Sequence, residues 1–198
     1  MAITIPPDEL LGLYASGWFP MTGVDGVMRI YSPDPRAILP LEKFHIPRGA
    51  RRAIADPAWE VRLDTAFDEV VRLCAARSQT WIDDRIAASY SALHSAGHAH
   101  SVEIWQDGLL AGGLYGVRIG GAFFGESMFH RVTGASKAAL ARLVQILRVG
   151  NFQLLDIQWI TPHLATFGAE EIPRKDYLRL LNRAMDSDAH WPEKPCIA

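Results

Sequence analysis

Residues 101–129 read SVEIWQDGLLAGGLYGVRIGGAFFGESMF, and this stretch predicts three consecutive β-strands. Ser101–Trp105 alternates between polar and apolar residues as a half-buried strand does, and Gln106–Gly108 supplies a tight turn after it. Leu109–Val117 and Ala122–Phe129 are two further apolar runs of strand length. Strands joined by such short connections pair antiparallel. The stretch therefore predicts the antiparallel centre of a β-sheet.

Helical patterns flank these strands on both sides. Apolar residues at helical spacing predict helices over residues 67–74 and 82–93, the second with Thr80 as its cap. Downstream, the sequence predicts a helix, a strand and a final helix over Ser136–Val149, Leu154–Ile160 and Asp176–Met185. This order of elements predicts an α+β fold with a mixed, mostly antiparallel sheet.

The first part of the chain differs in texture from the rest. Residues 1–62 hold eight of the 12 prolines, so short strands and turns are expected there. Asp8–Ser16 is the exception, with the spacing of a short helix that Asp8 would cap. We therefore expect a small proline-rich N-terminal domain over residues 1–62 and a second domain over residues 63–198.

The composition excludes several classes of protein. With 49% hydrophobic and 21% charged residues, the 198-residue chain is neither disordered nor collagen-like. A net charge of −2 excludes the globally basic character of a generic nucleic-acid binder. Basic residues nevertheless outnumber acidic ones over residues 36–52 and 118–148, at five to one in each range. These excesses are consistent with an RNA-backbone surface, and solvated faces explain them equally well.

Nothing in the sequence indicates a metal, a disulfide or a membrane. Cys74 and Cys196 lie far apart without metal-ligand spacing, so reduced thiols are expected. His94, His98 and His100 cross a predicted helix end and would not share one face, which argues against a zinc site. The N-terminus lacks a signal-peptide pattern, and no apolar run approaches the about 20 residues of a membrane span. A cytoplasmic protein is the expectation.

Two segments carry polar groups where packing alone would not place them. Asp156 and Gln158 lie two apart on a predicted strand, so their side chains share a face. There the carboxylate could hold the amide NH₂ while the amide oxygen accepts from an incoming amine. A merely solvated strand face is the alternative. Glu126 stands among aromatic residues and Met128, where it could be a base with a raised pKa, an anchor for an amine, or a salt-bridged strand end.

A third segment, Arg131–Lys137, places a glycine turn between two cations at a predicted helix start. Such a turn could cradle a phosphate, as the coenzyme A loop of GNAT-type acetyltransferases does, or could simply cap the helix. An acetyl-CoA-dependent N-acetyltransferase and a non-catalytic tRNA- or peptide-binding module therefore stand as alternatives to the function inferred next.

Seven ordered motifs resemble those of the bacterial leucyl/phenylalanyl-tRNA–protein transferases, over about residues 14–181. The motifs are Tyr31–Leu39, Thr80–Ile82, Leu93–Glu103, Gly112–Val117, Phe124–Phe129, Ala135–Lys137 and Asp156–Gln158. The resemblance implies that residues 63–198 form a GNAT-like domain behind an abbreviated N-terminal domain. It implies transfer of Leu or Phe, and less efficiently Met, from aminoacyl-tRNA to the N-terminal Arg or Lys of proteins, which marks them for N-end rule degradation. It implies no metal or organic cofactor, and we expect a monomer.

The same resemblance assigns roles to individual residues. Asp156 and Gln158 would orient and activate the acceptor amine, and Glu126 would anchor the positively charged acceptor. Trp81 would pack on the terminal adenosine, and Tyr31 replaces a frequent Trp of that adenosine site. The remaining aminoacyl-pocket positions are Leu114, Phe123, Gly125, Ser127, Met128, Leu143 and Leu155. Four basic residues are expected to contact the tRNA: Arg36, Arg48, Arg131 and Lys137.

Overall fold

The computed structural model describes residues 4–77 and 80–194, and a seven-stranded sheet runs through them. Its strands, in spatial order, are β4 (Glu60–Leu63), β5 (Ala99–Gln106), β6 (Leu109–Ile119), β7 (Ala122–His130), β8 (Leu154–Gln158), β3 (Arg36–Ile38) and β9 (Glu170–Ile172). Every neighbouring pair is antiparallel except the parallel pair of β7 and β8. The α+β class and the mixed, mostly antiparallel sheet are therefore confirmed.

The turn between β5 and β6 follows the sequence closely. Gln106 pairs with Leu109, which leaves Asp107 and Gly108 as a two-residue turn. Both turn residues have positive φ, 51° and 75°, as a type I′ hairpin turn requires. An Asp-Gly pair adopts these angles with little strain, so the predicted hairpin is confirmed.

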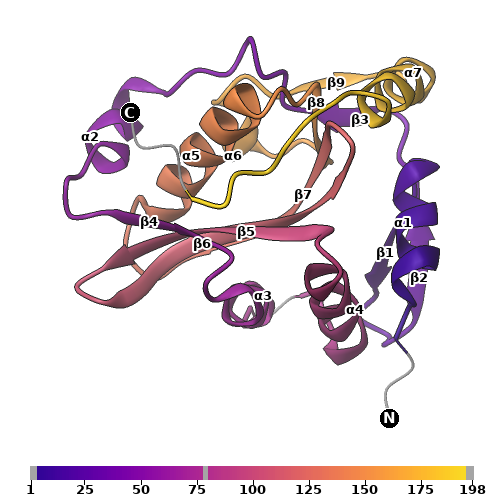
Figure 1. The fold of residues 1–198 in the computed structure, drawn as a ribbon, viewed down its shortest axis with the longest axis horizontal. Coiled ribbons are helices and arrows are strands. Elements are labelled where there is room, and N and C mark those ends of the chain that lie inside the picture. The colour runs from indigo at the N-terminus through magenta and orange to yellow at the C-terminus, as the bar shows by residue number, and fades with distance from the viewer. Residues whose placement is uncertain (1–3, 78–79, 195–198) are drawn as a thin grey trace.

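Helices cover both faces of the sheet (Figure 1). α3 (Phe67–Ala75) and α4 (Asp84–Ser95) lie on one face, and α5 (Ala135–Val149) lies on the other. Each face has its own hydrophobic cluster, because the side chains of a strand alternate between the two sides. The predicted helices are confirmed, with α7 spanning Arg174–Met185.

Two predicted helix caps are wrong. The N-cap of α4 is Asp83, whose carboxylate accepts hydrogen bonds from the backbone of Arg85 and Ile86. Thr80 lies before the helix, and its Oγ1 accepts a hydrogen bond from the backbone N–H of Ile82. α1 spans Pro7–Ala15, so Asp8 lies inside its first turn. Among the described residues, no side chain caps the start of this helix.

Short elements complete the fold: β1 (Phe19–Thr22), β2 (Met28–Tyr31), η1 (Arg48–Ala50), α2 (Arg51–Ile54) and α6 (Pro162–Ala165). β1 and β2 form a separate hairpin beside α1, whereas β3 enters the main sheet between β8 and β9 (Figure 1). The expected domain boundary at residue 62 stays a prediction.

The described residues also bear on the expectations about a membrane-spanning helix, a metal-binding cluster and free thiols. No helix in the described part is both long and apolar enough to cross a membrane. Within residues 4–77 and 80–194, no cluster of three His, Cys, Asp or Glu side chains could hold a metal ion. Cys74 is a buried free thiol, and Cys196 lies outside the described residues.

Candidate active site

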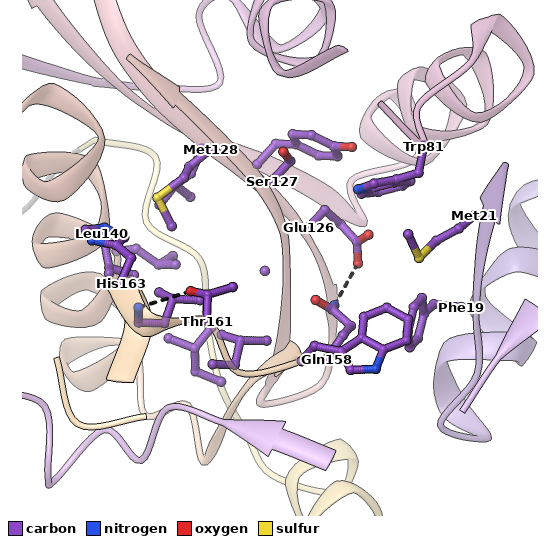
Figure 2. Close-up of a pocket in the computed structure, with 18 of the residues that line it drawn as sticks. Phe19, Met21, Trp81, Glu126, Ser127, Met128, Leu140, Gln158, Thr161 and His163 are labelled. Atoms are coloured by element: carbon purple, nitrogen blue, oxygen red, sulfur yellow. Dashed lines mark hydrogen bonds between the residues drawn. The ribbon is translucent and has the colours of Figure 1, made fainter. Parts of the chain in front are cut away.

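A cavity of about 340 Å³ opens where β6, β7 and β8 meet the β1 strand and α6. Its size suits a small-molecule group, and most of its lining is apolar or aromatic. Figure 2 shows Trp81, Met21 and Phe19 towards one side and Met128, Leu140 and His163 towards the other, with Glu126 and Gln158 between them. The cavity thus has two ends, separated by a polar pair.

A β-bulge aims Glu126 into this cavity. Tyr115 on β6 pairs with Ser127, and Gly116 pairs with Gly125, so Glu126 is the extra residue of β7. A bulged residue leaves the regular alternation of the strand, which frees its side chain to point along a new direction. The parallel register pairs Phe124 with Asp156, so the first residues of β7 lie beside β8 and Glu126 comes close to Gln158.

Three donors surround the Glu126 carboxylate. Tyr14 of α1 donates to its Oε1 at 2.7 Å, and Tyr90 of α4 donates to its Oε2 at 2.8 Å. The side-chain Nε2 of Gln158 donates to Oε1 at 3.2 Å (Figure 2). Burial raises the pKa values of Tyr14 and Tyr90, and the Glu126 charge raises them further, so both phenols stay protonated as donors.

The ionisation of Glu126 is balanced near neutral pH. Burial raises the pKa of its carboxyl to about 7, although the hydrogen bonds from Tyr14 and Tyr90 oppose that shift. The negative charge of Asp156 raises the pKa further, and the positive charge of Arg36 lowers it. A carboxyl group with this pKa beside an apolar cavity is a candidate catalytic or binding residue.

Gln158 ends β8 in an unusual backbone conformation. The strand was expected to continue to Ile160 but stops at Gln158, whose φ is 59°. A positive φ is uncommon for a residue with a side chain and is found preferentially at functional sites. The backbone N–H of Gln158 donates to Asp156 Oδ1 at 2.9 Å, whereas its side-chain amide does not bind Asp156. The expectation that Asp156 holds the Gln158 amide is therefore wrong, because Glu126 holds it.

Asp156 lies behind the cavity wall. Its side chain is fully buried and forms a two-point ion pair with Arg36, at 2.9 Å from Nε to Oδ1 and 2.6 Å from Nη2 to Oδ2. Tyr177 of α7 donates to the same Oδ2 at 2.8 Å. Neither Asp156 nor Arg36 lines the cavity.

Arg36 corrects another expectation. With 0% of its side chain exposed, it offers no surface to a phosphate, and the prediction that it contacts tRNA is wrong. Sequence reasoning missed its pairing with Asp156, which lies 120 residues away. The available signal was the apolar run Ala37–Leu39 directly after it, since an arginine leading into a buried strand needs an acidic partner.

The other predicted site residues fall into two groups. Seven of the expected aminoacyl- or adenosine-site residues line the cavity: Trp81, Leu114, Gly125, Ser127, Met128, Leu143 and Leu155. Phe123 does not line it, because its ring is fully buried and stacks on Trp191 at 5.4 Å between centroids. Tyr31 packs on Phe19 and Trp159, which line the cavity, but does not line it itself.

Sequence reasoning also missed several residues of the site, among them Tyr14, Phe19, Met21 and Tyr90. Phe19 and Met21 come from β1, within the region expected to hold only short strands and turns. Tyr14 and Tyr90 sit on helix faces that pack inward, where a phenol looks like ordinary core. Their hydroxyl groups were the only signal, since a buried hydroxyl needs a partner.

The remaining basic candidates lie at the surface. Arg48 in η1 is exposed, Arg131 follows β7 with 53% of its side chain exposed, and Lys137 lies in the first turn of α5. Gly134 caps that helix with a φ of 96°, a conformation that glycine adopts without strain. The assignment of these three residues to tRNA binding stays a prediction.

Comparison with known proteins gives a consistent result. The family described as leucyl/phenylalanyl-tRNA protein transferase matches residues 38–182. A leucyl/phenylalanyl-tRNA–protein transferase from Akkermansia muciniphila is 52% identical over 187 residues, covering 92% of this chain and 97% of that protein. Transferases of the same name from Salinibacter ruber and Herpetosiphon aurantiacus are each also 52% identical, covering 94% and 96% of this chain and 83% and 99% of those proteins.

Solved structures are more distant. A GCN5-related N-acetyltransferase-like protein from Streptococcus suis has 15% sequence identity and a TM-score of 0.40, covering 83% of this chain and 63% of that one. A TM-score of this size does not assign a fold, so the GNAT-like domain stays a prediction. The family match over residues 38–182 and the relatives at 52% identity establish that the chain belongs to the leucyl/phenylalanyl-tRNA–protein transferase family of aminoacyltransferases.

Proposed function

We propose that this protein transfers a leucyl or phenylalanyl group, and less readily a methionyl group, from aminoacyl-tRNA to the N-terminal Arg or Lys of acceptor proteins. Family membership supports the coarser statement, aminoacyl transfer from tRNA to protein. We further propose that the modified proteins are directed to N-end rule degradation in the cytoplasm. The observation that supports the proposal best is the largely apolar cavity whose two ends lie on either side of the hydrogen-bonded pair of Glu126 and Gln158.

The apolar end of the cavity suits the side chain of the donor amino acid. Met128 and Leu140 lie there (Figure 2), and Leu114 pairs with Met128 across β6 and β7. A leucyl or phenylalanyl group needs no charged partner. Methionine is flexible enough to pack against either a branched or an aromatic side chain. Pockets of this kind discriminate by only about 1–3 kcal/mol per methylene, which fits acceptance of more than one apolar amino acid.

The aromatic end suits the terminal nucleoside of the tRNA. Trp81, Phe19 and Met21 line this end, where a base could stack on an aromatic face (Figure 2). Arg48, Arg131 and Lys137 are exposed or partly exposed cations that could follow the phosphates of the acceptor stem.

The chemistry needs a neutral amine held against an ester. The α-amine of the acceptor attacks the aminoacyl carbonyl, a C–N bond forms, and the ester C–O bond breaks to release the ribose hydroxyl. The amine loses one proton, which the leaving ribose oxygen takes up. The Gln158 oxygen can accept an N–H of the amine while its Nε2 is held by Glu126. Because an amide is a poor base, positioning outweighs proton abstraction.

Glu126 supplies the negative charge of the site. When ionised, it attracts the positively charged acceptor, whose N-terminal residue carries a cationic side chain. Tyr14 and Tyr90 keep the carboxylate fixed, so the charge is aimed before the acceptor arrives.

A transfer assay tests the proposal. Purified protein is mixed with radiolabelled Leu-tRNA and a peptide that begins with Arg, and label should enter the peptide. The same peptide with an acetylated N-terminus is the matched control and should stay unlabelled, because its α-amine is blocked. Absence of label in the free peptide, with consumption of acetyl-CoA in a parallel reaction, would identify an N-acetyltransferase instead.

A further inference from the structure

A continuous chain of contacts leads from Arg36 to the cavity. Arg36 grips both oxygens of Asp156, and Asp156 Oδ1 accepts the backbone N–H of Gln158. The Gln158 side chain then turns into the cavity and donates to Glu126. Ala37, the residue after Arg36, pairs with Gln158 across the two strands, so the backbones of β3 and β8 meet at this point.

Arg36 and Tyr177 together hold the Asp156 carboxylate. Arg36 also donates from Nη1 to the Gly17 carbonyl oxygen at 3.1 Å, and its guanidinium lies 4.5 Å from the centroid of the Tyr177 ring. The Tyr177 hydroxyl donates to Asp156 Oδ2 at 2.8 Å. Burial alone would lower the pKa of Arg36, but the Asp156 charge raises it above its ordinary value, so the arginine stays charged. Planar, two-point recognition of this kind fixes the carboxylate in orientation as well as in place.

The geometry separates Asp156 from the reacting groups. Asp156 is 0% exposed and absent from the cavity lining, and its bond to Gln158 is to the backbone N–H. A proton passing from the Gln158 amide to Asp156 would have no direct hydrogen bond to follow. The hydrogen bond between the two residues instead restrains the backbone of Gln158, which has a φ of 59°.

We propose that Arg36 and Tyr177 are positioning residues, which hold Asp156 so that it locks the backbone of Gln158 and directs the Gln158 amide onto Glu126. Asp156 therefore acts on the reaction through backbone geometry and not as a proton relay. The inference deepens the proposed function and rests on it for its kinetic readout, whereas its spectroscopic readout needs no activity.

Two conservative variants test the inference. Tyr177→Phe removes the hydroxyl that binds Asp156 and keeps the ring against Arg36. Arg36→Lys keeps the positive charge but loses the two-point ion pair with Asp156. We expect kcat to fall about tenfold in Tyr177→Phe and about 100-fold in Arg36→Lys, with the KM for Leu-tRNA within about twofold of the wild type. Arg29→Lys is the matched control, because Arg29 makes a similar two-point pair with Asp25 at the exposed surface.

The second readout follows the Gln158 amide directly by NMR. Its side-chain NH₂ signals, identified by their loss in Gln158→Met, should shift as Glu126 ionises with its pKa of about 7. Other groups facing Glu126 are Tyr14 on α1, Tyr90 on α4, Asp156 on β8 and Arg36 on β3, and both tyrosines remain protonated through this range. We expect the shift at pH 7 to be lost in Arg36→Lys, reduced in Tyr177→Phe and unchanged in Arg29→Lys.

The outcomes separate the positioning role from simple stabilisation. A lower kcat together with a lost or reduced Gln158 titration in either folded variant supports the inference. Wild-type kcat in Tyr177→Phe, or a full Gln158 titration in a variant with reduced kcat, overturns it. If the wild-type protein transfers no amino acid, the proposed function fails, and the NMR titration alone still decides the positioning role.

Discussion

Glu126 carries the charge of the site, and its environment sets when that charge is present. Burial raises the pKa of its carboxyl to about 7, so the carboxylate form is depleted as the pH falls below that value. The α-amine of the acceptor, with an ordinary pKa of about 7.7–8.0, also needs to be deprotonated. Both requirements act in the same direction, so transfer should rise with pH from about 6 to 8.5.

Glu126→Gln should remove one of these two dependences. We expect kcat/KM at pH 8 to fall about 10- to 100-fold, the cost of losing a charge-assisted hydrogen bond. The remaining pH dependence should follow the α-amine alone, as measured by initial rates across this pH range. If the rate of the variant still rises with pH near pH 7, another group titrates there.

The stability of the same variant offers an independent check of the pKa. Because the folded pKa of Glu126 lies above its usual value of 4.5, the protein loses stability as the pH rises from about 4.5 through 7. Glutamine does not ionise, so the Tm of Glu126→Gln relative to the wild type should be higher at pH 8 than at pH 5. If the difference in Tm between the variant and the wild type is the same at pH 5 and pH 8, the pKa of the Glu126 carboxyl is not raised.

Met128 illustrates the selectivity expected of a single apolar residue. Met128→Ala enlarges the apolar end of the cavity, which should favour phenylalanyl over leucyl donors by about tenfold, within the 1–3 kcal/mol available to such contacts. The measurement is the ratio of kcat/KM for Phe-tRNA and Leu-tRNA. Met21→Ala, at the other end of the same cavity, is the matched control and should slow both donors without changing their ratio.

The site also depends on how β1 is held against α4. The Asp83 carboxylate that caps α4 also accepts from Thr22 Oγ1 at 3.0 Å, at the end of β1. The backbone N–H of Thr22 donates to the Trp81 carbonyl oxygen at 3.1 Å. The Asp83 side chain therefore caps the start of α4 and also binds the strand that brings Phe19 and Met21 to the cavity.

Asp83→Ala should loosen both elements together. We expect a loss of about 1–2 kcal/mol in the free energy of unfolding, as for removal of a helix cap, measured by urea denaturation. The KM for aminoacyl-tRNA should rise more than kcat falls, because the aromatic end of the cavity moves while Glu126 stays in place. Asp84→Ala changes an exposed carboxylate next to it and should leave KM unaltered. If both substitutions raised KM equally, the Asp83 side chain would not be what holds β1 at the cavity.

For the whole molecule, a net charge of −2 coexists with a proposed polyanionic substrate. The proposed tRNA surface is local, and Arg48, Arg131 and Lys137 are its candidates once Arg36 is assigned to the interior. An overall charge near zero limits non-specific binding to RNA, so the contacts should be few and their number measurable.

The salt dependence of tRNA binding measures those contacts. Alanine at Arg48, Arg131 or Lys137 should each lower the slope of log Kd against log salt concentration by about 0.7–0.9. Arg29→Ala is the control, since Arg29 is exposed but paired with Asp25. A slope unchanged by all three substitutions would move the tRNA surface elsewhere on the protein.

Features that depend on residues close together in the chain could be predicted from the sequence. Alternation and an Asp-Gly turn specified the hairpin of β5 and β6, and helical spacing specified α3, α4 and α5. The polar residues Glu126, Asp156 and Gln158 stood out against apolar surroundings because burying such groups requires partners.

The identity of those partners depends on contacts between segments that are distant in the sequence. The Arg36 ion pair joins residues 120 positions apart, and it exists because β3 enters the sheet beside β8. The bulge at Glu126 belongs to the register of β6 and β7, and the parallel pairing of β7 with β8 brings Glu126 to the Gln158 side chain. Hydrophobic patterns report which face of an element is buried, whereas strand order and register depend on contacts between distant segments, so the shape of the site was settled at that level.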